Sequence, residues 1–91
     1  MEITAKFCLG RIVITANALS NLTEAAILAG IRRHQAGDWG AVNEHDRLQN
    51  EESLKDGLRL WSVYHAACGL KFWVITEADR SATTILLPED Y

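Results

Sequence analysis

Cysteine, proline and methionine are all scarce in this chain. Its 91 residues include two cysteines, Cys8 and Cys68, one proline and one methionine. Two isolated cysteines cannot complete the four-ligand shell of a structural zinc site or form a disulfide framework. We therefore expect no metal and no cofactor. We expect both cysteines to pack as small hydrophobic side chains.

Long apolar segments are also missing. No run approaches the ~20 apolar residues that a membrane-spanning helix needs. The first ten residues, MEITAKFCLG, lack the basic start and long apolar centre of a secretory signal peptide. We therefore expect a cytoplasmic chain without membrane contact, in which both thiols stay reduced.

Positively charged residues are also few in this chain. Nine Lys and Arg stand against twelve Asp and Glu, which gives a formal net charge of −3 at pH 7. Nucleic-acid-binding domains usually carry a basic patch or stripe, and the only adjacent basic pair here is Arg32–Arg33. A nucleic-acid-binding regulator that uses this pair is therefore a weakly supported alternative.

The composition is that of an ordinary globular protein, with 48% hydrophobic and 23% charged residues. The length predicts a single domain over residues 1–91. A domain of this size buries roughly 60–65% of the surface of its unfolded chain. That burial can build one core, but it leaves no room for a deep enclosed active site as well.

The order of patterns along the chain predicts a strand, two helices and three further strands. A β-branched run favours a strand over residues 7–15, and residues 16–22 read as a connector with one helical turn. Asn21 and Glu24 have the spacing of a capping box, and Asn43 or Asp38 is expected to cap the second helix. The expected elements are helices over 23–35 and 42–55, then strands over 58–66, 70–77 and 82–87.

This order predicts an α+β fold of type β-α-α-β-β-β, with an antiparallel sheet and both helices packed on one face. Alternation along residues 70–77 places Trp73 and Ile75 on one face of the sheet and Phe72 and Val74 on the other. Aromatic side chains fall at or near cross-strand positions, where such pairs stabilise a sheet. These aromatics are Trp61, Tyr64, Phe72 and Trp73.

Two short segments carry groups suited to acid–base chemistry. The first, HQAGDWGAVNEHD over residues 34–46, holds His34 and His45 beside several carboxylates. The structural alternative is that its histidines are solvated and Trp39 closes the edge of the core. The second, Glu77 to Arg80, is a turn that could bind a phosphate or could serve only as a soluble hairpin tip.

Negative charge is concentrated in the middle of the chain. Residues 36–56 hold six acidic and two basic side chains, a formal charge of −4. Such a segment is predicted either to be a solvated helix face or to dock a basic protein surface. The predicted partner-binding residues are Asp38, Trp39, Glu44, Asp46, Glu51, Glu52, Asp56, Asp79 and Arg80.

Three blocks resemble a family of small bacterial proteins found on plasmids, phages and integrated elements. The blocks are residues 34–40 (HQAGDWG), 57–64 (GLRLWSVY) and 72–91 (FWVITEADRSATTILLPEDY). Such proteins are usually described as plasmid-related, and sometimes as restriction–modification subunits. A chain of 91 residues cannot hold a methyltransferase domain with its cofactor fold. The resemblance therefore implies a setting in a mobile element, and it supplies no catalytic residues.

The small size, the acidic middle segment and the resemblance together predict a non-enzymatic binding protein. We expect it to inhibit a host defence component through protein–protein contact, as an anti-CRISPR or antirestriction protein does. The alternative is a small metal-independent ribonuclease in which His34, Glu77 and Arg80 supply acid–base and phosphate-binding groups. An exposed edge strand would also permit a homodimer.

Overall fold

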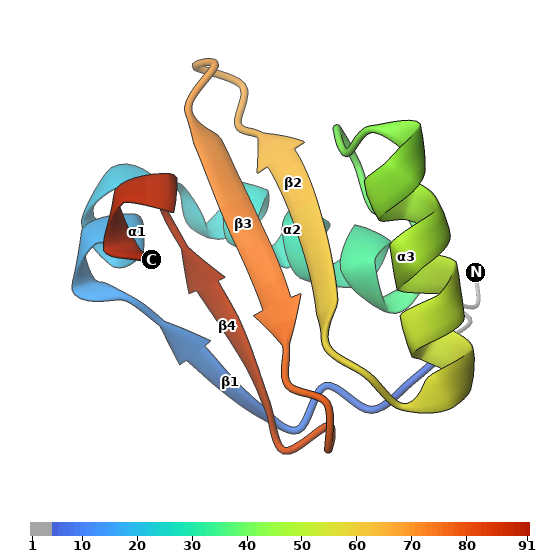
Figure 1. Ribbon diagram of the computed structural model, residues 1–91. Coiled ribbons are helices and arrows are strands. Elements are labelled where there is room, and N and C mark those ends of the chain that lie inside the picture. Colours follow the sequence, from blue (N-terminus) through green and yellow to red (C-terminus); the bar gives the residue numbers. More distant parts are fainter. Residues whose placement is uncertain (1–4) are drawn as a thin grey trace.

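The computed structural model describes residues 5–91, so the first four residues of MEITAKFCLG lie outside the described part. The chain has the predicted α+β class and order, with one α-helix and one 3-10 helix more than expected (Figure 1). The elements are β1 (Arg11–Ile14), α1 (Ala16–Asn21), α2 (Glu24–Gln35), α3 (Glu44–Asp56), β2 (Leu60–His65), β3 (Lys71–Thr76), β4 (Ala82–Leu86) and the 3-10 helix η1 (Pro88–Asp90).

The sheet is mixed, and the prediction of a purely antiparallel sheet is wrong. Its strand order is β1-β4-β3-β2. β2, β3 and β4 form an antiparallel meander, whereas β1 pairs in parallel with β4. Alternation within a strand does not encode its partner. The direction of β1 is decided by how the helical segment returns the chain to the sheet.

The helix starts correct two sequence predictions. Residues 16–22 are mostly helical, because the Thr15 side chain accepts a hydrogen bond from the backbone of Ala18 and starts α1. Thr23 caps α2 in the same way, so the capping box expected from Asn21 is not formed. Asn43 caps α3, as one of the two predicted alternatives, and Asp38 does not.

One face of the sheet carries the core, which α1 and α2 cover (Figure 1). Phe72 and Val74 point into this core and Trp73 and Ile75 lie on the opposite face, which confirms the predicted alternation. Gly30 of α2 lies directly against Phe72, since a Cβ at this position would come within 2.8 Å of the Phe72 ring. The core residues are Ala18, Leu22, Ile27, Tyr64, Phe72, Val74, Ile85 and Leu87.

Helix α3 does not cover the core-bearing face of the sheet with α1 and α2. It lies beside β2 at the edge of the sheet (Figure 1), so the expected packing of both long helices on one face is wrong for α3. Its buried residues, Asn50 and Ser53, are polar, while Leu48 is 53% exposed. A helix without a continuous apolar stripe gains little by covering a hydrophobic face.

The outer edge of β2 is covered by other parts of the same chain. Val63 donates a backbone hydrogen bond to Trp39 and accepts one from Ala41, at 3.1 and 2.7 Å. The Asn50 side chain pairs with both backbone groups of Trp61, at 2.6 and 3.0 Å. This edge is therefore closed to strand pairing with another chain. β1 occupies the other edge of the sheet.

Gly40 permits this closure, and we expect its substitution to be costly. It has a φ of +74°, and a Cβ would lie 2.0 Å from the Val63 carbonyl oxygen. Gly57 has a similar φ of +71° with nothing within 4 Å of such a Cβ. Urea denaturation should show that Gly57→Ala costs about 1–2 kcal/mol, from left-handed backbone strain alone. Gly40→Ala should cost at least about 2 kcal/mol more. Equal losses would contradict the clash.

Both cysteines are exposed, so the expectation that they are packed hydrophobic side chains is wrong. They lie in the segment before β1 and in the β2–β3 turn, where the backbone leaves the sheet. Between residues 5 and 91, no helix has the length and apolar character needed to cross a bilayer.

Candidate functional site

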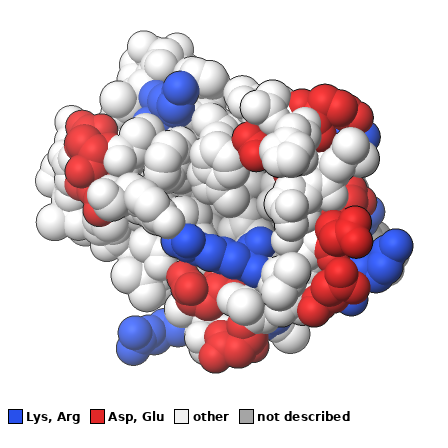
Figure 2. Space-filling model, in the orientation of Figure 1, with Lys and Arg blue, Asp and Glu red and all other residues white. Residues whose placement is uncertain are grey.

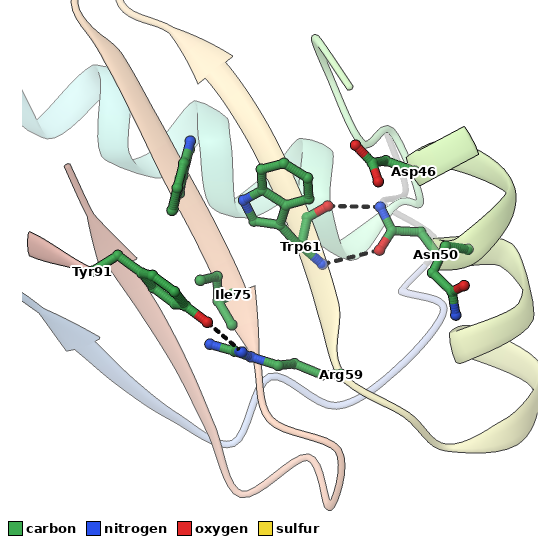
Figure 3. A pocket seen from close by; sticks show the side chains of 8 residues that line it. Asp46, Asn50, Arg59, Trp61, Ile75 and Tyr91 are labelled. Carbon is green, nitrogen blue, oxygen red and sulfur yellow. Dashed lines mark hydrogen bonds between the residues drawn. The ribbon is translucent and has the colours of Figure 1, made fainter. Parts of the chain in front are cut away.

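A hollow of about 320 Å³ lies on the face of the sheet opposite α2, between α3 and the C-terminal segment (Figure 3). Trp61 of β2 and Trp73 and Ile75 of β3 form its floor, because alternation turns them away from the core. The hollow is lined by Asp46, Gln49, Asn50, Arg59, Trp61, Trp73, Ile75 and Tyr91.

Three aromatic rings form a row along this face. Trp61 and Trp73 meet edge to face, with ring centroids 5.3 Å apart, and Trp73 meets Tyr91 in the same way at 5.6 Å. Such pairs hold their rings in fixed orientations. The indole Nε1 of Trp61 is buried without a hydrogen-bond partner in the described part of the chain. Figure 3 shows this nitrogen on the side of the ring away from Asn50.

Two charged side chains stand at opposite ends of the hollow (Figure 3). At one end the Arg59 guanidinium lies 5.3 Å from the Tyr91 ring centroid and donates a 2.8 Å hydrogen bond to the Tyr91 hydroxyl. At the other end stands Asp46, in the first turn of α3. Within residues 5–91 the Asp46 carboxylate has neither an ion pair nor a side-chain hydrogen bond.

Acidic side chains continue from this end along α3. Figure 2 shows them gathered on the side of the molecule that α3 forms, while positive side chains cross the lower rim of a central hollow. The predicted partner-binding residues on α3 thus share one edge of the molecule. They are Glu44, Asp46, Glu51, Glu52 and Asp56.

Part of this negative charge is already neutralised internally. Asp38 pairs with Arg33 at 2.7 Å, and this hydrogen bond lowers the pKa of Asp38. Glu44 pairs with Arg47 at 2.6 Å, which lowers its pKa as well. In the part of the chain that the structure describes, Asp46, Glu52 and Asp56 have no ion pair. These three residues carry the charge available to a partner.

Trp39 closes the edge of the core, as the structural alternative predicted. Its side chain is only 3% exposed, and its indole nitrogen donates a 2.7 Å hydrogen bond to Glu51. Its ring packs against Phe7 and His34. Trp39 therefore orients Glu51 on the acidic edge without presenting its own ring to a partner.

His34 is fully buried, so the expectation of a solvated histidine is wrong for this residue. Its Nδ1 lies 2.5 Å from Ser62 Oγ and its Nε2 lies 2.9 Å from Thr76 Oγ1. Thr76 in turn meets Thr83, which donates to the Leu9 carbonyl. Because that carbonyl only accepts, the chain of donors requires the proton on Nε2 and makes Nδ1 the acceptor from Ser62.

Burial fixes the charge of this histidine. Desolvation, aided by the positive charge of Arg80, lowers the pKa of His34 from 6.5 to about 3. The imidazole is therefore neutral at physiological pH and has no contact with solvent. It holds α2 against β2 and β3, and it is not placed to exchange protons with a substrate.

Arg80 holds the hairpin to the end of α3. Its backbone has a φ of +62°, a conformation unusual outside glycine. Its guanidinium donates to the carbonyls of Leu58 at 2.6 Å and Ser53 at 3.1 Å. Glu77 and Asp79 are exposed on the same turn, and Asp79 accepts from the backbone of Ser81 at 3.0 Å. Arg80 and Asp79 are therefore engaged with backbone groups, whereas Glu77 is exposed to solvent.

The three proposed catalytic residues do not converge on one accessible point. His34 is enclosed, Arg80 donates to backbone carbonyls, and Glu77 faces solvent. Arg32 and Arg33, the basic pair considered for nucleic-acid binding, lie on α2, which is behind the sheet in Figure 1. Within this pair, Arg33 is already paired with Asp38 and lies over the Tyr64 ring at 4.6 Å.

Sequence reasoning missed Arg59, Trp61, Trp73 and Tyr91 as a site. The available signal was the alternation that turns Trp61 and Trp73 away from the core. The predicted placement of both helices on one face of the sheet also leaves the other face without a helix.

No group of three or more His, Cys, Asp or Glu side chains in the described residues is placed to hold a metal ion. Comparison of the chain with protein-family models, with curated proteins and with solved structures finds no match.

Proposed function

We propose that this chain is a binding protein that contacts a protein partner through the aromatic hollow and the adjoining acidic edge of α3. We call this area the docking surface; it comprises Asp46, Gln49, Glu52, Asp56, Arg59, Trp61, Trp73 and Tyr91. The observation that carries the proposal is the aromatic row, in which Arg59 holds Tyr91, since Trp and Tyr are enriched at the energetic centres of protein interfaces. The unpaired carboxylates beside it supply steering and specificity.

The setting of the partner follows from the resemblance to proteins of mobile elements. A binding protein that performs no chemistry can inhibit another protein by occupying a surface that this protein needs. We therefore propose that the partner is a host defence component, such as a CRISPR or restriction protein, and that binding inhibits it. The disposition of His34, Glu77 and Arg80 supports binding over the ribonuclease alternative.

Site-directed photocrosslinking in bacterial cells tests the docking surface. A benzophenone amino acid at Gln49, on the rim of the hollow, should form a covalent adduct with one protein. The same amino acid at Leu28, which is 45% exposed on α2, should form none. Trp73→Ala combined with the label at Gln49 should abolish the adduct, with circular dichroism as the check on folding.

The inhibitory role has its own readout. Cells that carry an active restriction or CRISPR system should admit a targeted plasmid more often when they express this protein. Trp73→Ala should remove that protection, and Leu28→Ala should retain it. Adducts of equal intensity at both labelled positions would contradict the docking surface. An adduct at Gln49 without protection would contradict the inhibitory role alone.

A further inference from the structure

The hollow has the size and walls of a receptor for one long side chain. Its volume of about 320 Å³ is at the lower end of the range for ligand pockets. Its floor is made of Trp61, Trp73 and Ile75, which suit an aliphatic stem or a planar group. The hollow is open on one side to the acidic edge of α3 (Figures 2 and 3).

The polar groups around the hollow differ in whether they are still free to form hydrogen bonds or ion pairs with a ligand. Both polar ends of the Asn50 amide are occupied by the Trp61 backbone. Arg59 is engaged with the hydroxyl and the ring of Tyr91. The Asp46 carboxylate has no such partner in residues 5–91, and Gln49 lies one helix position before Asn50 on the same rim. The Trp61 indole N–H also lacks a partner in the described residues, but it is buried. The charged group left without a partner at the hollow is therefore the Asp46 carboxylate, at the negative end.

We infer that the docking surface receives an arginine side chain of the partner protein, with its guanidinium over Trp61 and paired with Asp46. This inference rests on the proposed function. Trp is the best ring for a cation, and the planar guanidinium both stacks on an aromatic face and matches a carboxylate with two parallel hydrogen bonds. The methylene stem would lie along the apolar floor, as arginine stems do.

The charges along α3 select the neighbourhood of that arginine. Glu52 and Asp56 continue the acidic edge beyond Asp46, so a second basic residue beside the first is favoured. The same carboxylates disfavour a phosphate backbone. Strand addition at β2 is blocked by the contacts of Asn50 and residues 39–41, so the partner docks side chains on the sheet face.

The three tryptophan indoles allow the inference to be tested directly by NMR. The ¹⁵N-labelled protein is titrated with an amidated hexa-arginine peptide, with the equally long hexa-citrulline peptide and with oligothymidylate. We expect hexa-arginine to shift the Nε1 resonances of Trp61 and Trp73. The Trp39 resonance, bonded to Glu51 within the core edge, should move least. Hexa-citrulline keeps the shape of arginine without its charge, and it should bind at least fivefold more weakly.

Two substitutions should change the affinity in opposite directions. Asp46→Asn should weaken hexa-arginine binding roughly fivefold through loss of the ion pair. Arg59→Gln should strengthen it severalfold, because it removes the positive charge from the other end of the hollow. Glu24→Gln on α2 removes the same charge as Asp46→Asn at an exposed position on another element, and it should leave the affinity within twofold.

Several results would overturn the inference. They are equal binding of hexa-arginine and hexa-citrulline, an affinity that Asp46→Asn leaves unchanged, and tighter binding of oligothymidylate than of hexa-arginine. A crosslink at Gln49 that forms equally in the wild type and in Asp46→Asn would refute the binding of a partner arginine at Asp46. It would leave the proposed function standing. Loss of both the crosslink and the peptide shifts would refute both.

Discussion

Between pH 6.5 and pH 5 we expect the protein to lose about 1.6 kcal/mol of its free energy of unfolding through His34 alone. The pKa of His34 falls from 6.5 to about 3 on folding because the imidazole is desolvated. The unfolded chain therefore binds a proton in this pH range and the folded chain does not. The stabilisation is complete well above pH 6.5, and it is lost as the pH falls through 6.5 toward 3.

Urea denaturation at pH 7, 6 and 5 measures this slope, and two variants assign it. His34→Gln should be about 2–4 kcal/mol less stable at pH 7, because an amide cannot reproduce both ring contacts to Ser62 and Thr76. It should also lose most of the slope between pH 6.5 and 5. His45→Gln, at an exposed position, should keep the wild-type slope. Carboxylates with lowered pKa values, such as Asp38, contribute only at lower pH.

Asn50→Asp should destabilise the fold by about 2–4 kcal/mol, although the two side chains have nearly the same shape. The Asn50 amide donates to the Trp61 carbonyl at 2.6 Å and accepts from its N–H at 3.0 Å. A carboxylate can only accept, so it would face the Trp61 carbonyl with one oxygen and bring a negative charge into a site that is 3% exposed. Chemical denaturation measures the loss.

Gln49→Glu is the matched control, because it makes the same amide-to-carboxylate change at the adjacent exposed residue. It should alter stability by less than about 0.5 kcal/mol. Hydrogen exchange locates the effect: the Trp61 amide should lose protection in Asn50→Asp and keep it in Gln49→Glu. If both variants are equally stable, the side chain of Asn50 does not secure the edge of β2.

Local signals predicted the elements well, because they depend on neighbours in the chain. The meander from β2 to β4 follows from alternation and turn residues, and Asn43 caps α3 as one of the two predicted alternatives. The two wrong predictions of helix starts also concern local signals. The caps formed by Thr15 and Thr23 are not among the predicted ones, and the connector with one helical turn that is predicted over residues 16–22 is the helix α1.

Much of the site could not be predicted, because burial and pairing join distant residues. His34 looked like a titratable group beside a glycine turn, but Ser62, Thr76 and solvent exclusion make it a neutral structural residue. Arg80 looked like a phosphate ligand, but the carbonyls of Ser53 and Leu58 occupy it. Neither contact has a signature in the sequence.

The sequence by itself determined the α+β class, the order of the elements, the face on which Trp73 lies and the acidic character of α3. These properties follow from side-chain periodicity and composition. The tertiary structure alone decided that β1 runs parallel to β4, that α3 closes an edge, and that Tyr91 and Arg59 meet Trp61 and Trp73 around a hollow. The physical reason is that strand partners and surface hollows depend on where the chain returns, and no local pattern encodes that return.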